Sequence, residues 1–547
     1  MQFQTARPEQ VRRAEWAVCL GATLAAIGLH VVYLTHAGGL WRDEASGLQL
    51  ATLPTVSEMW RMLTHEAFPA LFPTTLRCWS ALGLGRTDFG FRCLGFVIAL
   101  LLLGAVWLSA RVLRSSLPLL SLGLVATNLT VVRWGDSLRA YGLGSVLILL
   151  TLALVWSLIK APNAERFLGA TLAAVLSVQC LYQNAFLLFA ICIAGCFVCF
   201  RRRRDRTALT VVAVGAVAAV SLLPYLGPAR VSQRWWVVEQ TGFDAAAAWS
   251  SLSDALGSPM VWTVPVWLGL GLAAAGCGGW LLLDARGWKR RGDEDVRMFA
   301  AITLALAAFL FLTFVTISRL PTQPWYWLPL MVPAAVCIDA ALGGWPERYR
   351  GWRLGLVALL AFVPLITGVS LARYRQTNID VIAARLREQA KTNDLILVYP
   401  WFFGVTFNRY YAGATPWTTL PALVDLRVHR YDLLKERLAA TAPIKPVLDQ
   451  IARTLASGNR LWIVGDLPAP EAGETAPPGL PPAPEGPQGW FDVPYSYVWG
   501  RQAEHFIAAH GGRTEPVSTG SGDSVNLYEK ASLAVVSGWA FPSEPGR

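Results

Sequence analysis

Charged residues are scarce in this chain of 547 residues. Asp, Glu, Lys and Arg make up 15% of the sequence, whereas 54% of the residues are hydrophobic. A soluble globular protein has about a quarter charged residues, so the low charge excludes that class and indicates an integral membrane protein. The net charge of +11 does not require a nucleic-acid partner, because the basic residues gather in alternate loops between apolar segments.

Cysteine is missing from the C-terminal part of the chain. All nine cysteines lie before residue 340, so the C-terminal segment must be stabilised by its own hydrophobic core. Cys192, Cys196 and Cys199 share one predicted helix face, but no histidine accompanies them, and buried small side chains explain them better than a metal site. A GxGxxG turn and a P-loop are also missing from the C-terminal segment, so nothing there suggests nucleotide binding.

Long apolar runs, by contrast, are abundant. Most of them approach the roughly 20 residues that a helix needs to cross the hydrocarbon core of a bilayer. The first run lacks a small-residue cleavage site followed by soluble sequence, so we expect a membrane span there and not a signal peptide. The eleven predicted segments are 14–34, 89–110, 117–132, 140–159, 167–182, 184–200, 208–226, 261–283, 298–318, 325–343 and 353–372, of which 117–132 and 167–182 are short.

Basic residues alternate from one loop to the next. If the N-terminus is cytoplasmic, the positive-inside rule assigns the basic loops to the cytoplasm and the others to the outside. Eleven spans then place the C-terminal segment outside the plasma (inner) membrane. The basic loops are 111–114, 160–166, 201–206, 286–297 and 348–353, and the external ones include 35–88, 133–139, 227–260 and 319–324.

The composition changes at the end of the last apolar segment. We assign residues 1–375 to a transmembrane domain with an external loop at 35–88, and residues 376–547 to a soluble domain with a proline-rich loop at 467–489. Helical and strand patterns alternate in the second part, which predicts a small extracytoplasmic α/β domain. We expect it to recognise the acceptor or a partner. The predicted helices are 379–390, 446–455 and a third helix whose last residues are 505–511. The predicted strands are 394–399, 460–465 and 524–529.

An acidic pair, Asp43 and Glu44, follows the first apolar segment in Trp41-Arg42-Asp43-Glu44-Ala45. A juxtamembrane pair or the acidic start of a helix is the simplest explanation. Its place on the first external loop of a chain with many spans favours chemistry on a lipid-linked substrate at the bilayer surface.

A second polar motif, Arg133-Trp134-Gly135-Asp136-Ser137-Leu138-Arg139-Ala140-Tyr141, lies between the third and fourth segments. Its two arginines run against the positive-inside tendency of an external loop. They either pair with Asp136 or bind a phosphate, since guanidinium groups fork onto phosphate oxygens. Asp136 and Arg139 are three residues apart, on one face of a helix, so both explanations are compatible.

The order of these motifs resembles the GT-C superfamily of polyprenyl-phosphate-dependent glycosyltransferases, in its bacterial protein-mannosyltransferase and aminoarabinose-transferase-like branch. The resemblance covers roughly residues 10–375 and is strongest in 35–145. It implies a dozen or so spans, a catalytic acid on the first external loop and often a soluble external C-terminal domain. It rests on W-R-D-E-A-S-G-L-Q-L-A, E-A-F-P-A-L-F-P-T-T-L-R-C-W, T-D-F-G-F-R and G-D-S-L-R-A-Y-G-L.

The resemblance implies roles for individual residues. Asp43 matches the catalytic aspartate of the family and Glu44 its companion, while Arg92 matches an arginine that opens the second span. The acidic-x-x-Arg-x-Tyr element at the start of the fourth span is matched by Asp136, Arg139 and Tyr141.

The chain departs from the family at one element. Many relatives have His-Pro-Pro-Leu where this chain has Phe68-Pro69-Ala70-Leu71. His65 lies one helical turn earlier and is a candidate substitute, although a lone loop histidine is more often neither ligand nor base. The contribution of this element to acceptor or metal binding stays open; no cofactor is implied with certainty, and a divalent cation is compatible with the residues.

The implied reaction transfers a sugar from a polyprenyl-phosphate donor to an extracytoplasmic glycan, lipid or protein acceptor, with inversion. It needs a base, which we assign to Asp43, and positive charge for the phosphate, which we assign first to Arg139 and then to Arg319. The main rival is a transporter or flippase of lipid-linked precursors, which would place ionisable residues at mid-membrane depth and show repeated halves. Asp and Glu are nearly absent from the apolar segments. A non-catalytic envelope-assembly subunit is the third alternative.

Overall fold

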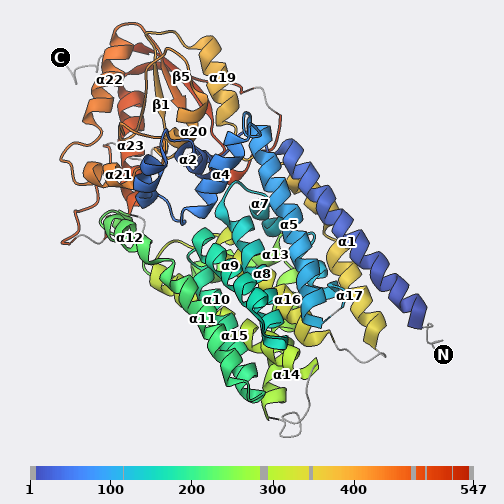
Figure 1. The fold of residues 1–547 in the computed structure, drawn as a ribbon. Coiled ribbons are helices and arrows are strands. Elements are labelled where there is room, and N and C mark those ends of the chain that lie inside the picture. Colours follow the sequence, from blue (N-terminus) through green and yellow to red (C-terminus); the bar gives the residue numbers. More distant parts are fainter. Residues whose placement is uncertain are drawn as a thin grey trace. The chain divides into compact units, whose positions relative to one another are not determined.

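A computed structural model describes residues 8–114, 116–238, 240–283, 293–343, 349–469, 476–486, 489–519 and 522–540. The chain divides into two compact units, and many of their elements are labelled in Figure 1. The sheet unit includes two segments, Ala37–Ala67 and Gly227–Thr241, that the sequence pattern assigns to the membrane domain. The predicted boundary at residues 375 and 376 stays a prediction. The membrane unit consists of Met1–His36, Phe68–Leu226 and Gly242–Arg373, and the rest of the sheet unit is Tyr374–Arg547.

The membrane unit is built of α-helices, since a chain that crosses a bilayer must satisfy its backbone hydrogen bonds internally. Its elements are α1 (Pro8–His36), α4 (Leu71–Ala81), α5 (Asp88–Arg114), α6 (Leu119–Val125), α7 (Leu129–Gly135), α8 (Ala140–Lys160), α9 (Ala164–Cys180), α10 (Asn184–Arg201), α11 (Asp205–Val220), η2 (Leu223–Tyr225), α13 (Ala245–Gly257), α14 (Thr263–Leu283), α15 (Asp293–Ser318), η5 (Pro324–Trp327), α16 (Leu328–Leu342), α17 (Arg350–Phe362) and α18 (Leu365–Ala372). Helix α12 (Leu226–Ser232) begins in this unit and continues into the other.

Nine helical segments among the described residues are long and apolar enough to cross a membrane. They correspond to nine of the eleven predicted segments, and the predicted fold class, a multi-pass helical membrane protein with a C-terminal α/β domain, is confirmed. The count of eleven is not. The nine segments are Glu9–His36, Asp88–Arg114, Ala140–Lys160, Asn184–Arg201, Asp205–Ser232, Thr263–Leu283, Asp293–Ser318, Pro324–Leu342 and Arg350–Ala372.

The two remaining predicted segments are the short ones. Segment 117–132 contains α6 and α7, each of seven residues, so each is only about 10 Å long. The break between them is fixed by Asn128, whose side chain accepts a hydrogen bond from the backbone N–H of Val131 and so caps α7. Segment 167–182 corresponds to α9, which has 17 residues.

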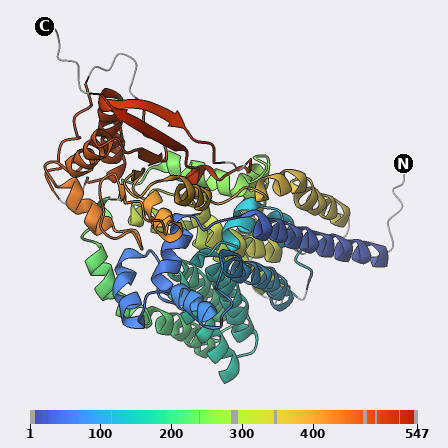
Figure 2. The same cartoon turned by 90° about the horizontal axis from the view of Figure 1, so that it is seen from above.

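Close helix packing in the membrane unit depends on glycine at two positions beside the α7–α8 turn. A Cβ atom on Gly95 would lie 2.0 Å from the carbonyl oxygen of Asp136, and one on Gly142 would lie 2.1 Å from that of Gly135. Any side chain at either position would therefore push α5 or α8 away from the turn. Segments far apart in the sequence also meet, since α1 packs against α17, as Figure 2 shows from above.

The sheet unit contains a five-stranded mixed sheet of order β2-β1-β3-β5-β4. The strands β1 (Leu395–Val398), β2 (Trp417–Thr419) and β3 (Leu461–Val464) are parallel, and β5 (Leu533–Trp539) runs antiparallel to both β3 and β4 (Gly511–Pro516). The helices of this unit are α2 (Arg42–Ala51), α3 (Val56–Met62), η1 (Leu63–His65), η3 (Trp236–Val238), α19 (Ile379–Gln389), α20 (Phe403–Tyr410), α21 (Tyr431–Leu438), α22 (Lys445–Ala456), α23 (Asp492–His510) and η7 (Leu527–Glu529).

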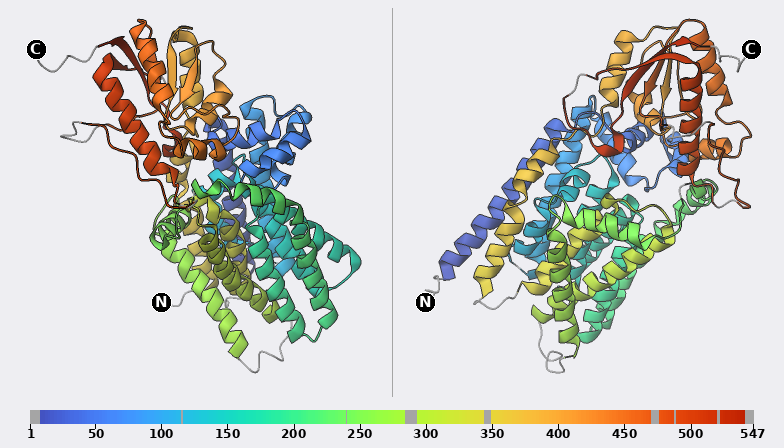
Figure 3. Two further views of the ribbon diagram at one scale, coloured as in Figure 1. Left: turned by 90° about the vertical axis from the view of Figure 1, so that its left-hand side faces the viewer. Right: turned by 180° about the vertical axis from the view of Figure 1, so that it is seen from behind.

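Helices cover both faces of this sheet, as Figure 3 shows. Alternate residues of a strand point to opposite faces, and β1 illustrates the rule. Leu395 and Leu397 pack in a core with α22 and α23, whereas Ile396 and Val398 pack in a second core with α19 and α20. The predicted α/β character of the C-terminal segment is therefore built as three layers.

The last predicted strand, at 524–529, is wrong. Val525 forms an isolated bridge with Arg375, and Leu527–Glu529 is a short 3-10 helix. The side chain of Asn526 accepts a hydrogen bond from the N–H of Tyr528, which turns the chain where an extended strand would continue. The final strand is β5 instead. The predicted proline-rich loop at 467–489 lies partly outside the described residues, and its described part contains no regular helix or strand.

Candidate functional site

The acidic pair that follows the first apolar segment, Asp43 and Glu44, lies in the first turn of α2, in the sheet unit. Negative side chains are favourable there because the N-terminal end of a helix carries partial positive charge. The two carboxylates differ in accessibility: Glu44 is fully buried, whereas the side chain of Asp43 is 24% exposed. Asp43 is therefore the carboxylate of the pair that solvent can reach.

Two basic side chains flank the Asp43 carboxylate. Arg42 Nε and His429 Nε2 each lie 3.8 Å from Asp43 Oδ1. His429 is held by aromatic neighbours, stacking on Tyr431 and meeting Trp401 edge-on. The guanidinium group of Arg42 lies 4.5 Å from the ring centre of Phe402. Asp43 is thus a partly exposed carboxylate beside basic and aromatic side chains.

His65 occupies a different setting in the same unit. Its ring stacks on Trp235, with ring centres 5.0 Å apart, and its Nδ1 lies 3.8 Å from Asp432 Oδ1. Burial lowers the pKa of His65, and the nearby Asp432 carboxylate opposes that shift. A neutral, stacked imidazole between protein groups fits a packing role, and the role of His65 in substrate binding stays a prediction.

One segment of the sheet unit, residues 425–432, meets both of these loop residues. His429 contacts Asp43, and Asp432 contacts His65. The segment is stiffened by Arg430, which donates hydrogen bonds to both Asp425 and Asp432. Burial alone would raise the pKa of Asp425, but the Arg427 hydrogen bonds and the two arginine charges outweigh it and hold that pKa at about 2. The sequence analysis missed this segment, although it carries one of only six histidines in the chain.

The second predicted motif lies in the membrane unit, at the turn between α7 and α8. Asp136 follows the last residue of α7, and Arg139 precedes the first residue of α8. Asp136, Arg139 and Tyr141 are all buried, with exposed fractions of 1%, 8% and 4%. A buried guanidinium at the N-terminal end of a long helix creates a positive environment that suits an anion such as phosphate.

A buried histidine that the sequence analysis missed pairs with this motif. His30 Nδ1 and Asp136 Oδ2 are hydrogen-bonded at 3.2 Å, and both side chains are buried. Tyr33 lies about one turn further along α1, with its hydroxyl 3.5 Å from Arg92 Nη1. Helix α1 therefore contacts two of the predicted site residues, Asp136 and Arg92. An ionisable residue inside an apolar span is a functional signal in its own right, and His30 could have been found that way.

Phe68, at a position where the sequence resemblance predicts a histidine, packs on the same motif. Its ring centre lies 4.5 Å from the guanidinium carbon of Arg139, and its ring meets Tyr141 edge-on at 5.1 Å. A cation over an aromatic face is attracted to it. Phe68 therefore contacts the Arg139 guanidinium through the face of its ring.

Arg319, the weaker phosphate candidate, follows α15 and is exposed. Its φ angle of 54° lies in the left-handed region that non-glycine residues rarely adopt. The predicted site residues divide between the units: Asp43, Glu44 and His65 belong to the sheet unit, and Arg92, Asp136, Arg139, Tyr141 and Arg319 to the membrane unit.

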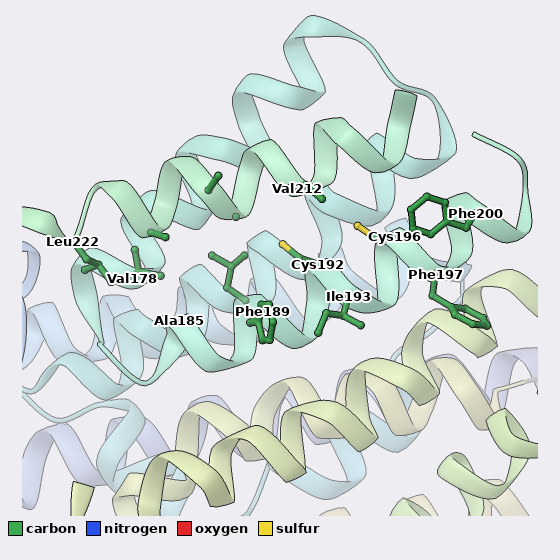
Figure 4. A pocket seen from close by; sticks show the side chains of 14 residues that line it. Val178, Ala185, Phe189, Cys192, Ile193, Cys196, Phe197, Phe200, Val212 and Leu222 are labelled. Atoms are coloured by element: carbon green, nitrogen blue, oxygen red, sulfur yellow. The ribbon is translucent and has the colours of Figure 1, made fainter. Parts of the chain in front are cut away.

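The described residues offer neither a cluster of metal ligands nor charged groups in an apolar cavity beside α10. Among the described residues, no group of three or more His, Cys, Asp or Glu side chains is placed to hold a metal ion. A cavity of about 680 Å³ between α9, α10 and α11 is lined by apolar side chains and by Cys192 and Cys196 (Figure 4). It suits a hydrocarbon chain and offers no charge to a phosphate.

Sequence comparisons find no matching family model and no matching curated protein. Among solved structures, the chain is similar to the oligosaccharyltransferase of Archaeoglobus fulgidus in its apo form, with a TM-score of 0.51 and 11% identity over 83% of this chain and 69% of that one. The same protein tethered to an acceptor peptide gives 0.50 and 12%, over 92% and 73%. ArnT from Cupriavidus metallidurans bound to undecaprenyl phosphate gives 0.49 and 13%, over 81% and 92%.

These similarities concern the fold. The chain has the GT-C fold, as the sequence motifs predict. Because one fold hosts many activities, the activity of this chain must be argued from its own residues.

Proposed function

We propose that this protein is a membrane glycosyltransferase of GT-C type, which transfers a sugar from a polyprenyl-phosphate donor to an extracytoplasmic glycan, lipid or protein. It acts in the plasma (inner) membrane, with a cytoplasmic N-terminus and an extracytoplasmic C-terminal domain. The observation that carries the proposal is the accessible carboxylate of Asp43, set beside His429 at the start of a helix in a chain with the GT-C fold.

The reaction assigns one step to Asp43. The oxygen of the acceptor hydroxyl attacks the anomeric carbon, and its proton passes to the Asp43 carboxylate, which acts as general base. The bond between the anomeric carbon and the phosphate oxygen breaks, and its electron pair stays on that oxygen. Polyprenyl phosphate leaves from the opposite side, so the configuration at the anomeric carbon inverts. Glu44, which is fully buried, supports Asp43 and does not take the proton.

The leaving phosphate needs positive charge, which we assign to Arg139. Its guanidinium is buried over the ring of Phe68, which also meets the ring of Tyr141, and charge-assisted hydrogen bonds to phosphate are stronger where water is excluded. The hydrogen bond between Asp136 and His30 holds the turn that carries Arg139. Arg92, Tyr141 and Arg319 are secondary candidates for donor binding, and His65 is the weakest because its ring is stacked and enclosed.

One observation favours the transporter alternative, namely the buried His30–Asp136 pair at the end of α1. Ionisable pairs inside membrane proteins often belong to ion or proton pathways. The two functions differ in their product: a transporter moves the intact lipid-linked sugar, whereas a transferase releases polyprenyl phosphate.

The test begins with the glycans and lipids of the cell envelope, compared between cells that contain and cells that lack the protein. A sugar that is lost without the protein identifies the donor, which is then supplied as its polyprenyl phosphate to the purified protein in proteoliposomes. Release of polyprenyl phosphate with a glycosylated acceptor supports the proposal. An unchanged envelope, or movement of the intact donor across the bilayer without cleavage, contradicts it.

A further inference from the structure

The N-terminal end of α2 is capped by a residue from the far C-terminal part of the chain. The first backbone N–H groups of a helix lack partners within the helix and usually bond to a nearby Ser, Thr, Asp or Asn. Here Trp41 precedes the helix, and its side chain forms no capping bond. The N–H of Arg42 instead donates to the carboxyl group of Glu529, at 3.1 Å from Oε1 and 3.0 Å from Oε2.

Glu529 is itself held in one position. It is fully buried, and the hydroxyl of Thr406 donates to its Oε1 at 2.6 Å. Burial raises the pKa of Glu529 to about 8, against the opposing effects of the Arg42 guanidinium and the Thr406 hydrogen bond. A neutral carboxyl group still accepts the Arg42 N–H through its carbonyl oxygen.

Other bonds fix the same helix to the same C-terminal part. The Nη1 of Arg42 donates to the carbonyl oxygen of Tyr528 at 2.8 Å, and the N–H of Leu40 donates to the hydroxyl of Tyr410 at 2.6 Å. At the other end of α2, Asn408 Nδ2 donates to Gln49 Oε1 at 2.7 Å. Since both ends of this short helix are bound, the backbone of α2 that carries Asp43 cannot shift without breaking at least one of these bonds.

We propose that Glu529 is a positioning residue for the transfer reaction, which aims the Asp43 carboxylate by fixing the first turn of α2. This inference rests on the proposed function, in which Asp43 is the general base. The C-terminal domain then has a second task besides acceptor recognition, because it completes the site on the first external loop. A misplacement of about 1 Å in a reacting group can cost about a hundred-fold in rate, so the cap acts on the chemical step.

The experiment compares three variants in proteoliposomes with the polyprenyl-phosphate donor. Glu529→Ala removes the hydrogen-bond acceptor and should lower kcat by about 10- to 100-fold while the KM for the donor changes by about two-fold or less. Glu529→Gln keeps a carbonyl oxygen for Arg42 and should stay within about three-fold of the wild-type kcat. Glu388→Ala removes an exposed carboxylate from α19 of the same unit and serves as the matched control, with wild-type kinetics.

Hydrogen exchange provides a readout that does not depend on activity. The backbone amides of residues 42–44 should exchange faster in Glu529→Ala than in the wild type, and at the wild-type rate in Glu529→Gln. If Glu529→Ala does not insert correctly, Thr406→Val tests the same point, because it removes the bond that holds the carboxyl group and should lower kcat without changing donor KM.

Each outcome bears on one part of the proposal. Faster exchange with an unchanged kcat would overturn the positioning role, and unchanged exchange would overturn the cap itself. A kcat in Glu529→Gln as low as in Glu529→Ala would mean that the hydrogen bond is not the active feature. Absence of any transfer by the wild type would contradict the proposed function, and the exchange result would still report on the cap.

Discussion

His429 Nε2 lies 3.8 Å from Asp43 Oδ1, which brings an imidazole of the C-terminal segment to a carboxylate at the start of α2. Both residues belong to the sheet unit, and the imidazole is fixed between Tyr431 and Trp401. The proposed base therefore has a defined neighbour that can steady its orientation without blocking its exposed side.

The first prediction concerns His429. The separation of 3.8 Å exceeds an ordinary hydrogen bond, and partly exposed ion pairs contribute about 1 kcal/mol or less. His429→Gln should therefore lower kcat by roughly five-fold or less and leave the donor KM unchanged. His505→Gln, which changes another imidazole of the same unit, is the control. A loss in His429→Gln as large as in Asp43→Asn would instead make His429 the base.

The second prediction concerns Arg139. Arg139→Ala removes a charge-assisted contact worth about 1.5–3 kcal/mol, so the Kd for the donor should rise about ten-fold or more. Phe68→Leu keeps the charge and removes the ring face beneath it, so its effect should be smaller. Arg111→Ala changes an exposed arginine of the membrane unit and should leave the Kd unchanged. Equal affinities of all three variants for labelled donor would mean that Arg139 does not bind the donor phosphate.

The third prediction concerns the His30–Asp136 pair. Replacing one partner of a buried pair costs about 3–5 kcal/mol, because the remaining buried group loses a hydrogen bond that water does not replace. His30→Leu should therefore lower the Tm of the purified protein more than the double variant His30→Leu/Asp136→Leu does. A double variant whose Tm loss equals the sum of the two single losses would mean that the pair makes no coupled contribution.

The fourth prediction is a pH dependence that comes from Glu529. Its pKa is raised to about 8 in the folded state, whereas an unfolded glutamate titrates near about 4.3. Between these values the folded state binds the proton more tightly than the unfolded state. The stability that this group contributes is therefore fully present below the unfolded pKa and is lost as the pH rises through the folded pKa. Arg42 and Asp43 are the charged groups that act on it, and the Thr406 hydroxyl and the Arg42 N–H donate hydrogen bonds to it.

The measurement for Glu529 is the Tm of the purified protein between about pH 5 and about pH 8. Glu529→Gln carries no proton to lose, so its Tm should fall less over this range than that of the wild type. Identical slopes would show that Glu529 does not titrate in this window.

Many local elements of this protein could be predicted from the sequence, because the spacing of apolar residues and the length of an apolar run are local properties of the chain. The nine long spans, the strands around residues 394–399 and 460–465 and the helix at 379–390 all follow from such patterns. The predicted strand at 524–529 is wrong because the alternation of apolar and polar residues gives no sign that a side chain caps a turn there. Asn526 caps a short 3-10 helix, and β5 begins only at Leu533.

The candidate site was only partly predictable. Asp43 and Arg139 were identified from the order of the sequence motifs, and their roles stay predictions. Several residues that contact the predicted site could not be identified from the sequence. His429, Glu529 and His30 lie far along the chain from the residues that they contact, and no local pattern reports a contact that forms only on folding. The ionisable His30 inside an apolar span was the one visible signal.

A single-turnover transfer assay on Asp43→Asn in proteoliposomes, with donor binding measured on the same sample, decides whether Asp43 is the general base. The substitution keeps the shape of the side chain and removes its basicity, so donor binding should be retained while transfer falls by about 10²- to 10⁴-fold. Glu44→Gln should lose less. A correctly inserted Asp43→Asn protein that transfers sugar at the wild-type rate would contradict the assignment of Asp43 as the base and with it the proposed enzyme.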